Sequence, residues 1–330
     1  MIFGSVPVSE AVGAILAHSL PGATRRVGKG TVLTDADVHE LATAGHSNLV
    51  VARLDDNDVE ENAAAARLAA AVVPHPDAQG VRISAAGAGR VNLYATGPGI
   101  VALDADRITA INSIDPMITI ATVAPHHRVD AGTMLATIKI ISYAVDSNKL
   151  DAAVDAADRA MHVRPPVYRT ATLIETRVGN SDPASKGRAA LTGRLDRLNV
   201  DLGPRVIVPH RADPLAQAIS EAEEDVVFIL TASATSDAND VAPAALRDAG
   251  GTLTAYGMPV DPGNLLFFGS HAGRPVIGLP GCARSPALNG ADWVLERLLC
   301  GVDLSQADIA AMGVGGLLKE IPTRPRPRDG

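Results

Sequence analysis

Residues 226–240 read VVFILTASATSDAND, and this stretch decides the fold. The five consecutive apolar residues from Val226 to Leu230 predict a strand that is buried on both faces, as in the parallel sheets of α/β proteins. The small and hydroxyl-bearing residues that follow predict a loop, and a helix is expected from Asp240 onward. A buried strand, a loop and a helix in this order form the repeating unit of an α/β domain.

The same alternation extends on both sides of this stretch, over residues 167–302. Further strands are predicted at 172–175, 205–208, 252–256 and 275–279, and helices at 186–198, 214–222, 240–249 and 287–299. We therefore expect a three-layer α/β/α domain with a mostly parallel sheet. Residues 303–330 end in prolines that alternate with arginines, from Pro322 to Arg328, and this composition predicts a tail or linker.

Residues 1–163 do not show this regular alternation of strands and helices. Residues 1–75 predict an α+β region with helices at 9–20 and 55–73, a further helix opened by Thr34-Asp35, and strands at 26–33 and 48–52. Residues 76–163 carry short β-branched runs at 91–95, 100–103, 118–122 and 135–140, then an alanine-rich helix at 151–161. These runs predict a β-rich region like a small barrel or sandwich. Arg164-Pro165-Pro166 is typical of a domain linker.

Composition excludes several classes of protein. The net charge of −8 and an aromatic content of 3% argue against nucleic-acid binding, which needs clustered cations or exposed rings in series. No apolar run reaches the 18 or so residues that a membrane-spanning helix requires. The two cysteines, Cys282 and Cys300, indicate neither a disulfide framework nor a zinc site, so we expect a reduced, cytoplasmic protein.

In open α/β sheets, ligands bind beyond the carboxyl ends of the strands, so the loops there are the candidate site. In the loop from Thr231 to Asp240, small side chains let backbone amides approach an anion at a helix N-terminus. The alternative is that Asp237 or Asp240 only caps the helix. After the strand at 275–279, Gly281 permits close backbone approach and Arg284 offers a fork for an anion. The alternative there is a tight turn with a solvated arginine.

The third loop follows the strand at 172–175 and brings Lys186 into the first turn of a helix. The alternative is capping by Asp182 with Pro183 at the first helical position. Phosphate-loop, dinucleotide-binding, HExxH and CxxC motifs are absent. Among the histidines, the doublet His126-His127 is expected in a solvated loop, and His210 is a weaker site candidate. The acidic run from Asp55 to Glu61 favours capping of the next helix over a ligand or metal role.

Three segments resemble a known family. Residues 257–264, GMPVDPGN, and residues 273–281, GRPVIGLPG, are similar to the "PGKP … GxPVxGLPGNPxS" signature of the molybdopterin-binding domain. That domain is shared by molybdopterin molybdenumtransferases and gephyrin. The loop at 231–240 is similar to the same family's "TGGxSxGDxD" loop. The three segments occur in the family's order and spacing.

The sequence also departs from the family pattern. Ala232-Ser233-Ala234 replaces the paired glycines, residues 281–285 read GCARS in place of GNPxS, and residues 176–180 replace TGDEL. The GCARSP and MPVDPGN forms, with residues 89–95, resemble more closely a bacterial subfamily. In that subfamily the module precedes a domain like that of molybdenum cofactor cytidylyltransferases. The resemblance covers nearly the whole chain, and the second domain would begin near Arg328.

The resemblance implies the ligand and the residues that hold it. The ligand is molybdopterin, a pterin dithiolene with a terminal phosphate, with molybdate and Mg²⁺ as further candidates. Asp237 and Asp240 are implied as catalytic residues and Mg²⁺ ligands. The implied binding residues are Lys186, Ser233, Thr235, Asp261, Gly263, Asn264, Pro280, Gly281, Cys282, Arg284 and Ser285. Family members dimerise and complete each other's sites through their amino-terminal segments, which adds Arg90 and Asn92.

Three functions follow from these observations. The missing glycines favour a binding protein that presents molybdopterin to a cytidylyltransferase-like partner for nucleotide attachment. The first alternative is a transferase that inserts molybdate into molybdopterin. The second is a binder of another phosphorylated heterocycle, because a fold alone does not fix its ligand.

Overall fold

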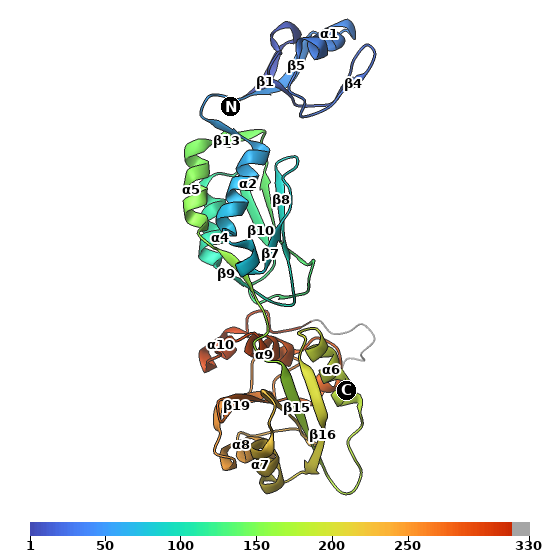
Figure 1. Cartoon of the computed structure of the whole chain (residues 1–330), viewed down its shortest axis with the longest axis vertical. Coiled ribbons are helices and arrows are strands. Elements are labelled where there is room, and N and C mark those ends of the chain that lie inside the picture. Colours follow the sequence, from blue (N-terminus) through green and yellow to red (C-terminus); the bar gives the residue numbers. More distant parts are fainter. Residues whose placement is uncertain (319–330) are drawn as a thin grey trace. The chain divides into compact units, whose positions relative to one another are not determined.

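The computed structural model describes residues 1–318 (Figure 1). The prolines and arginines predicted to form a tail, Pro322 to Arg328, lie outside the described residues. The chain divides into two compact units, and the second begins at Arg164, with residues 98–100 also belonging to it. None of the helices in the described part is long and apolar enough to cross a lipid bilayer.

The first unit opens with a small sheet in the order β1-β5-β2. Its strands are β1 (Ile2–Pro7), β2 (Ile15–Leu16) and β5 (Asn48–Arg53), and β3 (Leu20–Pro21) pairs with β4 (Arg26–Val27). The helix α1 (Asp35–Thr43) begins where predicted, because Thr34 and Asp37 form a reciprocal capping box. Leu16, Leu41 and Leu49 belong to the core of this part.

The helix predicted at 9–20 is wrong. Only Val8–Glu10 form a single 3₁₀ turn (η1), and β2 and β3 follow it. Gly13 has a φ of 78°, which interrupts a right-handed helix, and Ile15 and Leu16 pair with Ala52 and Val51 of β5. Pairing with a distant strand therefore overrode the helical spacing of the apolar residues. The strand predicted at 26–33 is limited to Arg26–Val27.

The rest of the first unit consists of sheets covered by helices, not the predicted barrel or sandwich. The four-stranded antiparallel sheet has the order β10-β12-β8-β7, and a second sheet has the order β11-β9-β14. The helices α2, α4 and α5 pack against one another and onto the strands (Figure 1). The elements are β6 (Asp58–Glu60), α2 (Glu61–Val72), α3 (Pro76–Gln79), β7 (Val81–Ile83), β8 (Arg90–Ala95), β9 (Gly99–Leu103), α4 (Ala105–Ile114), β10 (Ile118–Thr122), β11 (Arg128–Val129), β12 (Met134–Ile140), β13 (Ala144–Asp146), α5 (Ser147–Ala157) and β14 (Met161–Arg164).

The acidic run before α2 has structural partners. Glu60 caps α2 by accepting hydrogen bonds from the amides of Asn62 and Ala63. Asp58 belongs to β6, which pairs with β13, and its carboxylate forms an ion pair with the amino group of Met1 at 2.6 Å. The run therefore has the capping role that the sequence favoured.

The second unit is built on a six-stranded sheet with the order β16-β15-β17-β20-β19-β18. The first four strands in this order, β16, β15, β17 and β20, are parallel to one another. β19 is antiparallel to both of its neighbours, β20 and β18. The predicted α/β class is therefore confirmed. The elements are β15 (Thr170–Arg177), α6 (Lys186–Asp196), β16 (Asp201–Pro209), α7 (Ala212–Glu221), β17 (Val226–Leu230), α8 (Val241–Asp248), β18 (Thr252–Tyr256), β19 (Phe267–His271), β20 (Arg274–Gly278), η2 (Gly281–Arg284), α9 (Gly290–Leu299) and α10 (Gln306–Ala311).

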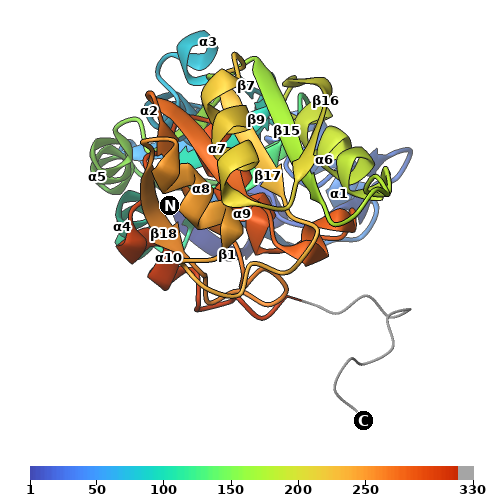
Figure 2. The ribbon, with the colours of Figure 1, turned by 90° about the horizontal axis from the view of Figure 1, so that it is seen from below.

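Helices cover both faces of this sheet. Alternate residues of a strand point to opposite faces, so Leu173 and Phe228 pack in the core that includes α6 and α9. Ile174 and Val227 pack in the core that includes α7 and α8, which lie side by side (Figure 2). The sequence missed β19, and α9 begins three residues later than predicted because Asn289 and Asp292 form its capping box.

Candidate functional site

The candidate loops of the second unit lie at one edge of the sheet. β15, β17 and β20 run parallel, so the loops 178–185, 231–240 and 279–289 all follow carboxyl ends. β18 is antiparallel to β19, which is antiparallel to β20, so β18 also ends there and is followed by the loop 257–266. This edge is where open α/β sheets bind ligands.

Hydrogen bonds from Thr231 and Tyr256 hold the loop after β17 in place. Thr231 Oγ1 donates a hydrogen bond to the carbonyl of Ser233 at 2.6 Å, and the Tyr256 hydroxyl donates to the carbonyl of Thr235 at 3.0 Å. Ser233 itself is exposed, whereas Thr235 is buried. Ser233 is therefore presented to solvent by a loop whose ends are fixed, while Thr235 supports the loop.

His210 and Thr176 tie this loop to the neighbouring strands. The amide of Ala232 donates to Thr176 Oγ1 at 2.8 Å, and Thr176 Oγ1 lies 2.9 Å from His210 Nδ1. His210 follows β16, so the contact joins the end of β15 to the loops after β16 and β17. The structure gives this weaker sequence candidate a place in the same cluster.

Asp237 and Asp240 bind backbone amides. Asp240 caps α8 by accepting from Val241 at 2.7 Å and from Ser236 at 2.9 Å, and Asp237 accepts from Asn239 at 2.7 Å. Burial, followed by the charges of the two aspartates, raises the pKa of Tyr256. In the described part of the chain no three acidic, histidine or cysteine side chains gather as a metal site. The magnesium role of the two aspartates stays a prediction.

Arg284 joins the loop after β20 to the loop after β17. It is half-buried in η2, and its Nη2 donates to the carbonyl of Thr231 at 2.5 Å. Gly187, in the first turn of α6, lies against the same place: a Cβ there would overlap Leu230 Cδ2 and lie 3.3 Å from Arg284 Cγ. The structure therefore brings together the ends of all three predicted loops.

The first turn of α6 offers backbone donors to an anion. Ser185 is its N-cap residue, and within the described residues its side chain accepts no capping hydrogen bond. The turn contains no acid, and Lys186 is exposed in it. Asp182, predicted as the alternative cap, pairs instead with Arg177 at 2.9 Å. The partial positive charge of this helix end therefore has no capping carboxylate, which fits an anionic ligand.

The remaining residues of the loop after β20 shape its turn. Pro280 is buried, and its carbonyl accepts from Ala283 at 2.9 Å. The carbonyl of Cys282 accepts from the amide of Ser285 at 3.0 Å, and Ser285 Oγ accepts from Ala287 at 3.3 Å. Cys282 and Cys300 form no disulfide, and burial raises the pKa of Cys300 to about 12.

Asp261, Gly263 and Asn264 hold the loop after β18. A Cβ at Gly263 would lie 2.8 Å from the amide nitrogen of Gly290, so the loop packs directly on the first turn of α9. Asn264 accepts from the amide of Met258 at 3.0 Å, and Asp261 pairs through its backbone with residues 316 and 318. These contacts are structural, and a ligand role for the three residues stays a prediction.

Sequence reasoning missed a buried arginine. Arg194 of α6 donates to the carbonyls of Ala283 and Ser285, both at 2.9 Å, and to that of Ala287 at 3.2 Å. It also forms a buried ion pair with Asp292 of α9. Arg194 therefore fixes the loop that carries Arg284. Its position on the apolar stripe with Leu191, Leu195 and Leu198 was the available signal.

Glu175 is a second missed residue. It is 1% exposed on β15, and its Oε2 pairs with Arg205 Nε at 2.7 Å. Arg205 also donates to the carbonyl of Pro183 and so tethers the loop before α6. Among the described residues Glu175 Oε1 has no hydrogen-bond partner. A charged residue directly after Leu173 and Ile174 in a predicted buried strand was the signal.

Arg90 and Asn92 belong to the first unit. Both lie on β8, where Arg90 is exposed and Asn92 Nδ2 donates to the Tyr94 hydroxyl at 3.3 Å. Their predicted role in a neighbouring copy's site stays a prediction.

The fold of the second unit defines an α/β protein with a cluster of polar loops at its strand ends. Comparison with known proteins adds little to this. Residues 5–53 match the model of a family described as "Domain of unknown function (DUF8806)", and no curated protein matches the chain. Two solved structures of the molybdopterin biosynthesis MoeA protein are similar. The one from Pyrococcus horikoshii is 14% identical, with a TM-score of 0.31, and covers 91% of this chain and 75% of its own.

The second, from Pyrococcus horikoshii OT3, is 11% identical, with a TM-score of 0.28, and covers 92% of this chain and 75% of its own. Likenesses of this size establish neither the fold nor the function of this chain.

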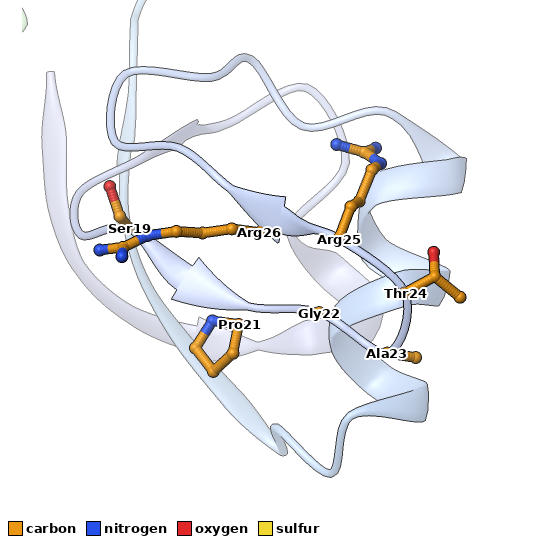
Figure 3. A pocket seen from close by; sticks show the side chains of 7 residues that line it. All are labelled: Ser19, Pro21, Gly22, Ala23, Thr24, Arg25 and Arg26. Carbon is orange, nitrogen blue, oxygen red and sulfur yellow. The ribbon is translucent and has the colours of Figure 1, made fainter.

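A cavity of about 430 Å³ lies within the segment that matches the family of unknown function, between Ser19 and Arg26 (Figure 3). Arg25 forms an ion pair with Asp37 of α1 at 2.5 Å, and Thr24 donates to Glu40 at 2.8 Å. These contacts fix the hairpin onto α1. The walls are mostly exposed turn residues, so the cavity is a shallow surface feature.

Proposed function

We propose that this protein binds molybdopterin, or its molybdenum-loaded form, in molybdenum cofactor biosynthesis. It presents the ligand to a cytidylyltransferase-like partner for nucleotide attachment. The observation that carries the proposal is the meeting of three loops at the hydrogen bond between Arg284 and Thr231, with the uncapped first turn of α6 against it. Two of these loops, with the loop after β18, carry the motifs that resemble the molybdopterin-binding domain. The helix-covered faces of the sheet suit the three-layer arrangement expected of that domain.

The exposed donors suit the terminal phosphate of the ligand. Lys186 and Ser233 are exposed in the loops at the strand ends, and Arg284 adds a guanidinium against Gly187 in the first turn of α6. Charge-assisted hydrogen bonds to a phosphate from such donors are short and strong. Ser285 and Thr235 then support the loops on either side of the phosphate.

The protein acts as a carrier in this proposal. A transferase would use Asp237 and Asp240 as catalytic residues, but both carboxylates already accept hydrogen bonds from backbone amides. Asp237 is exposed and uses one oxygen for this contact, so the other oxygen remains for a Mg²⁺ shared with the ligand phosphate. Molybdate enters the proposal only as cargo already joined to the pterin.

A homodimer belongs to the same proposal, with Arg90 and Asn92 completing the site of the other copy. Gel filtration with light scattering tests this part. A monomer at micromolar concentration would remove it without affecting the proposed ligand.

The test of the function is equilibrium binding of purified molybdopterin to the full chain, with and without molybdate, Mg²⁺ and CTP, with the products followed by mass. We expect tight binding without turnover, and CMP attachment only when a cytidylyltransferase is added. Arg284→Gln should weaken binding by about tenfold or more, since it removes a charge-assisted hydrogen bond. Arg197→Gln, an exposed arginine at the far end of α6, is the matched control.

Three results would contradict the proposal. Molybdate-dependent conversion without a partner would restore the transferase. Equal affinity of the Arg284 and Arg197 variants would place the ligand elsewhere. Absence of binding would mean that the substituted loops take another phosphorylated heterocycle.

A further inference from the structure

The largest cavity among those described lies in the first unit, far in sequence from the proposed molybdopterin site. It has a volume of about 570 Å³, within the range of small-molecule sites. Its walls come from β1, from the segment after β2, from the turn before β10 and from the residues between β12 and β13. The proposed function leaves this cavity without a role.

The apolar wall is unusually exposed for side chains of this type. Phe3 is 55% exposed, Met117 41% and Ile141 57%, and all three line the cavity. Tyr143 stands beside Phe3 with the two rings nearly parallel, at 13° and with centroids 6.4 Å apart. Exposed apolar side chains that gather in one hollow mark a binding site more often than the same residues scattered singly. Two parallel rings favour a planar aromatic ligand, which stacks on their faces.

The charges in the cavity leave a cation available. Its three carboxylates have partners: Asp58 pairs with the amino group of Met1, Asp115 pairs with Lys149 at 2.5 Å, and Asp146 caps α5. Lys29 lies over the Tyr143 ring, with Nζ 5.7 Å from its centroid. The nearby Glu61 forms its ion pair with Lys139 at 3.8 Å. Within the described residues the ammonium of Lys29 forms no ion pair, although burial raises the pKa of the Glu61 carboxyl and the charge of Lys29 partly opposes this shift.

From these observations we infer that this cavity binds a planar aromatic heterocycle that carries an anionic group, with the ring against Phe3 and Tyr143 and the anion at Lys29. His18 is exposed at the same wall, and a ring N–H of its imidazole can donate to the anion as a second donor beside Lys29. A nucleotide and an anionic pterin share this chemistry. The site is independent of the molybdopterin site in the second unit.

Calorimetric titration of the full chain with AMP, CMP and pterin-6-carboxylate tests the inference and separates the two sources. Adenosine is the control that keeps the ring of AMP without its charge, and inorganic phosphate is the control that keeps the charge without the ring. We expect at least one of the three anionic heterocycles to bind with a Kd below about 1 mM and about tenfold more tightly than adenosine or phosphate. The probe with the lower Kd, nucleotide or pterin, identifies the class of ligand.

Variants then locate the binding. Lys29→Gln should weaken it by about tenfold through loss of the cation, and Phe3→Leu should weaken it while keeping apolar volume. Ile2→Ala and Arg26→Gln are matched controls, since both residues are exposed, lie in the same part of the chain and do not line the cavity. Arg284→Gln should leave this binding unchanged.

The inference is overturned if none of the three probes binds at about 1 mM, or if adenosine binds as tightly as AMP. It is also overturned if Lys29→Gln and Phe3→Leu bind like the unaltered protein. Loss of binding in Arg284→Gln alone would assign the probe to the second unit and remove the new site.

Discussion

Gly187 is the residue on which the geometry of the proposed molybdopterin site depends most directly. It lets the first turn of α6 approach Leu230 and Arg284, where any side chain would collide. Arg194 and Glu175 are buried charges that hold the loops of the site in place. Arg194 donates to backbone carbonyls of the loop after β20, and Glu175 pairs with Arg205, which donates to the loop before α6. A buried charge without its partner is strongly destabilising, which keeps these pairs together.

Replacing Gly187 by alanine should lower the free energy of unfolding by about 1–3 kcal/mol, because the methyl group overpacks the contact with Leu230. Gly193 is the matched control on the same helix. It has open space around its Cβ position, so Gly193→Ala should stabilise the protein by about 0.4–1 kcal/mol. Urea unfolding of both variants checks the pair, and equal effects would contradict the close contact seen at Gly187.

A second residue prediction concerns acid. Hydrogen bonds from Thr34, first, and from Arg25 hold the pKa of Asp37 at about 2, below its ordinary 3.8. Because this pKa is depressed in the folded state, the stabilisation is present above about pH 4 and is lost as the pH falls toward 2. Asp37→Asn should remove this part of the acid dependence. Unfolding followed by a probe in the first unit between pH 5 and 2 measures it, and an unchanged slope in the variant would contradict it.

At the scale of elements, sequence reasoning worked where structure is local. The elements from residue 172 to 256 were predicted in the right order and type, because buried runs and capping residues lie within each element, although β15 and β16 are about twice as long as the predicted strands. The helix at 9–20 failed because Ile15 and Leu16 pair with residues more than thirty positions away. The loops of the site were predictable from the rule that ligands meet strand ends. Arg194 was not predicted: its place on the apolar stripe of α6 indicated that it is buried, but its partner Asp292 lies on another helix, 98 residues away.

One prediction belongs to the element α6. Ser185→Asp should place a carboxylate beside the first turn, which contains no acid, and stabilise the helix by about 0.3–1 kcal/mol through the helix dipole. The same carboxylate should weaken molybdopterin binding, because it competes with the phosphate for the first-turn amides. Thermal unfolding measures the expected gain in stability, and the binding titration measures the expected loss of molybdopterin affinity. A stabilised variant that binds the ligand as well as before would remove the helix end from the proposed site.

At the scale of the whole molecule, the two units have separate cores. Leu93 belongs to the core of the first unit and Phe228 to that of the second, and both are fully buried. Leu93→Ala should cost about 2–5 kcal/mol and Phe228→Ala about 3–5 kcal/mol. If the units unfold separately, hydrogen exchange will show each variant losing protection only in its own unit. Loss of protection throughout the chain in both variants would show one cooperative molecule.

The division of the chain has a consequence for its synthesis. Residues 98–100 belong to the second unit, although they precede the end of the first, and Ile100 is completely buried in the second core. On the ribosome, domains normally mature in the order in which they emerge. Here Ile100 must stay without its core until the chain from Arg164 onward has been made. The side chain of Ile100 therefore finds its core only after more than sixty further residues have been synthesised.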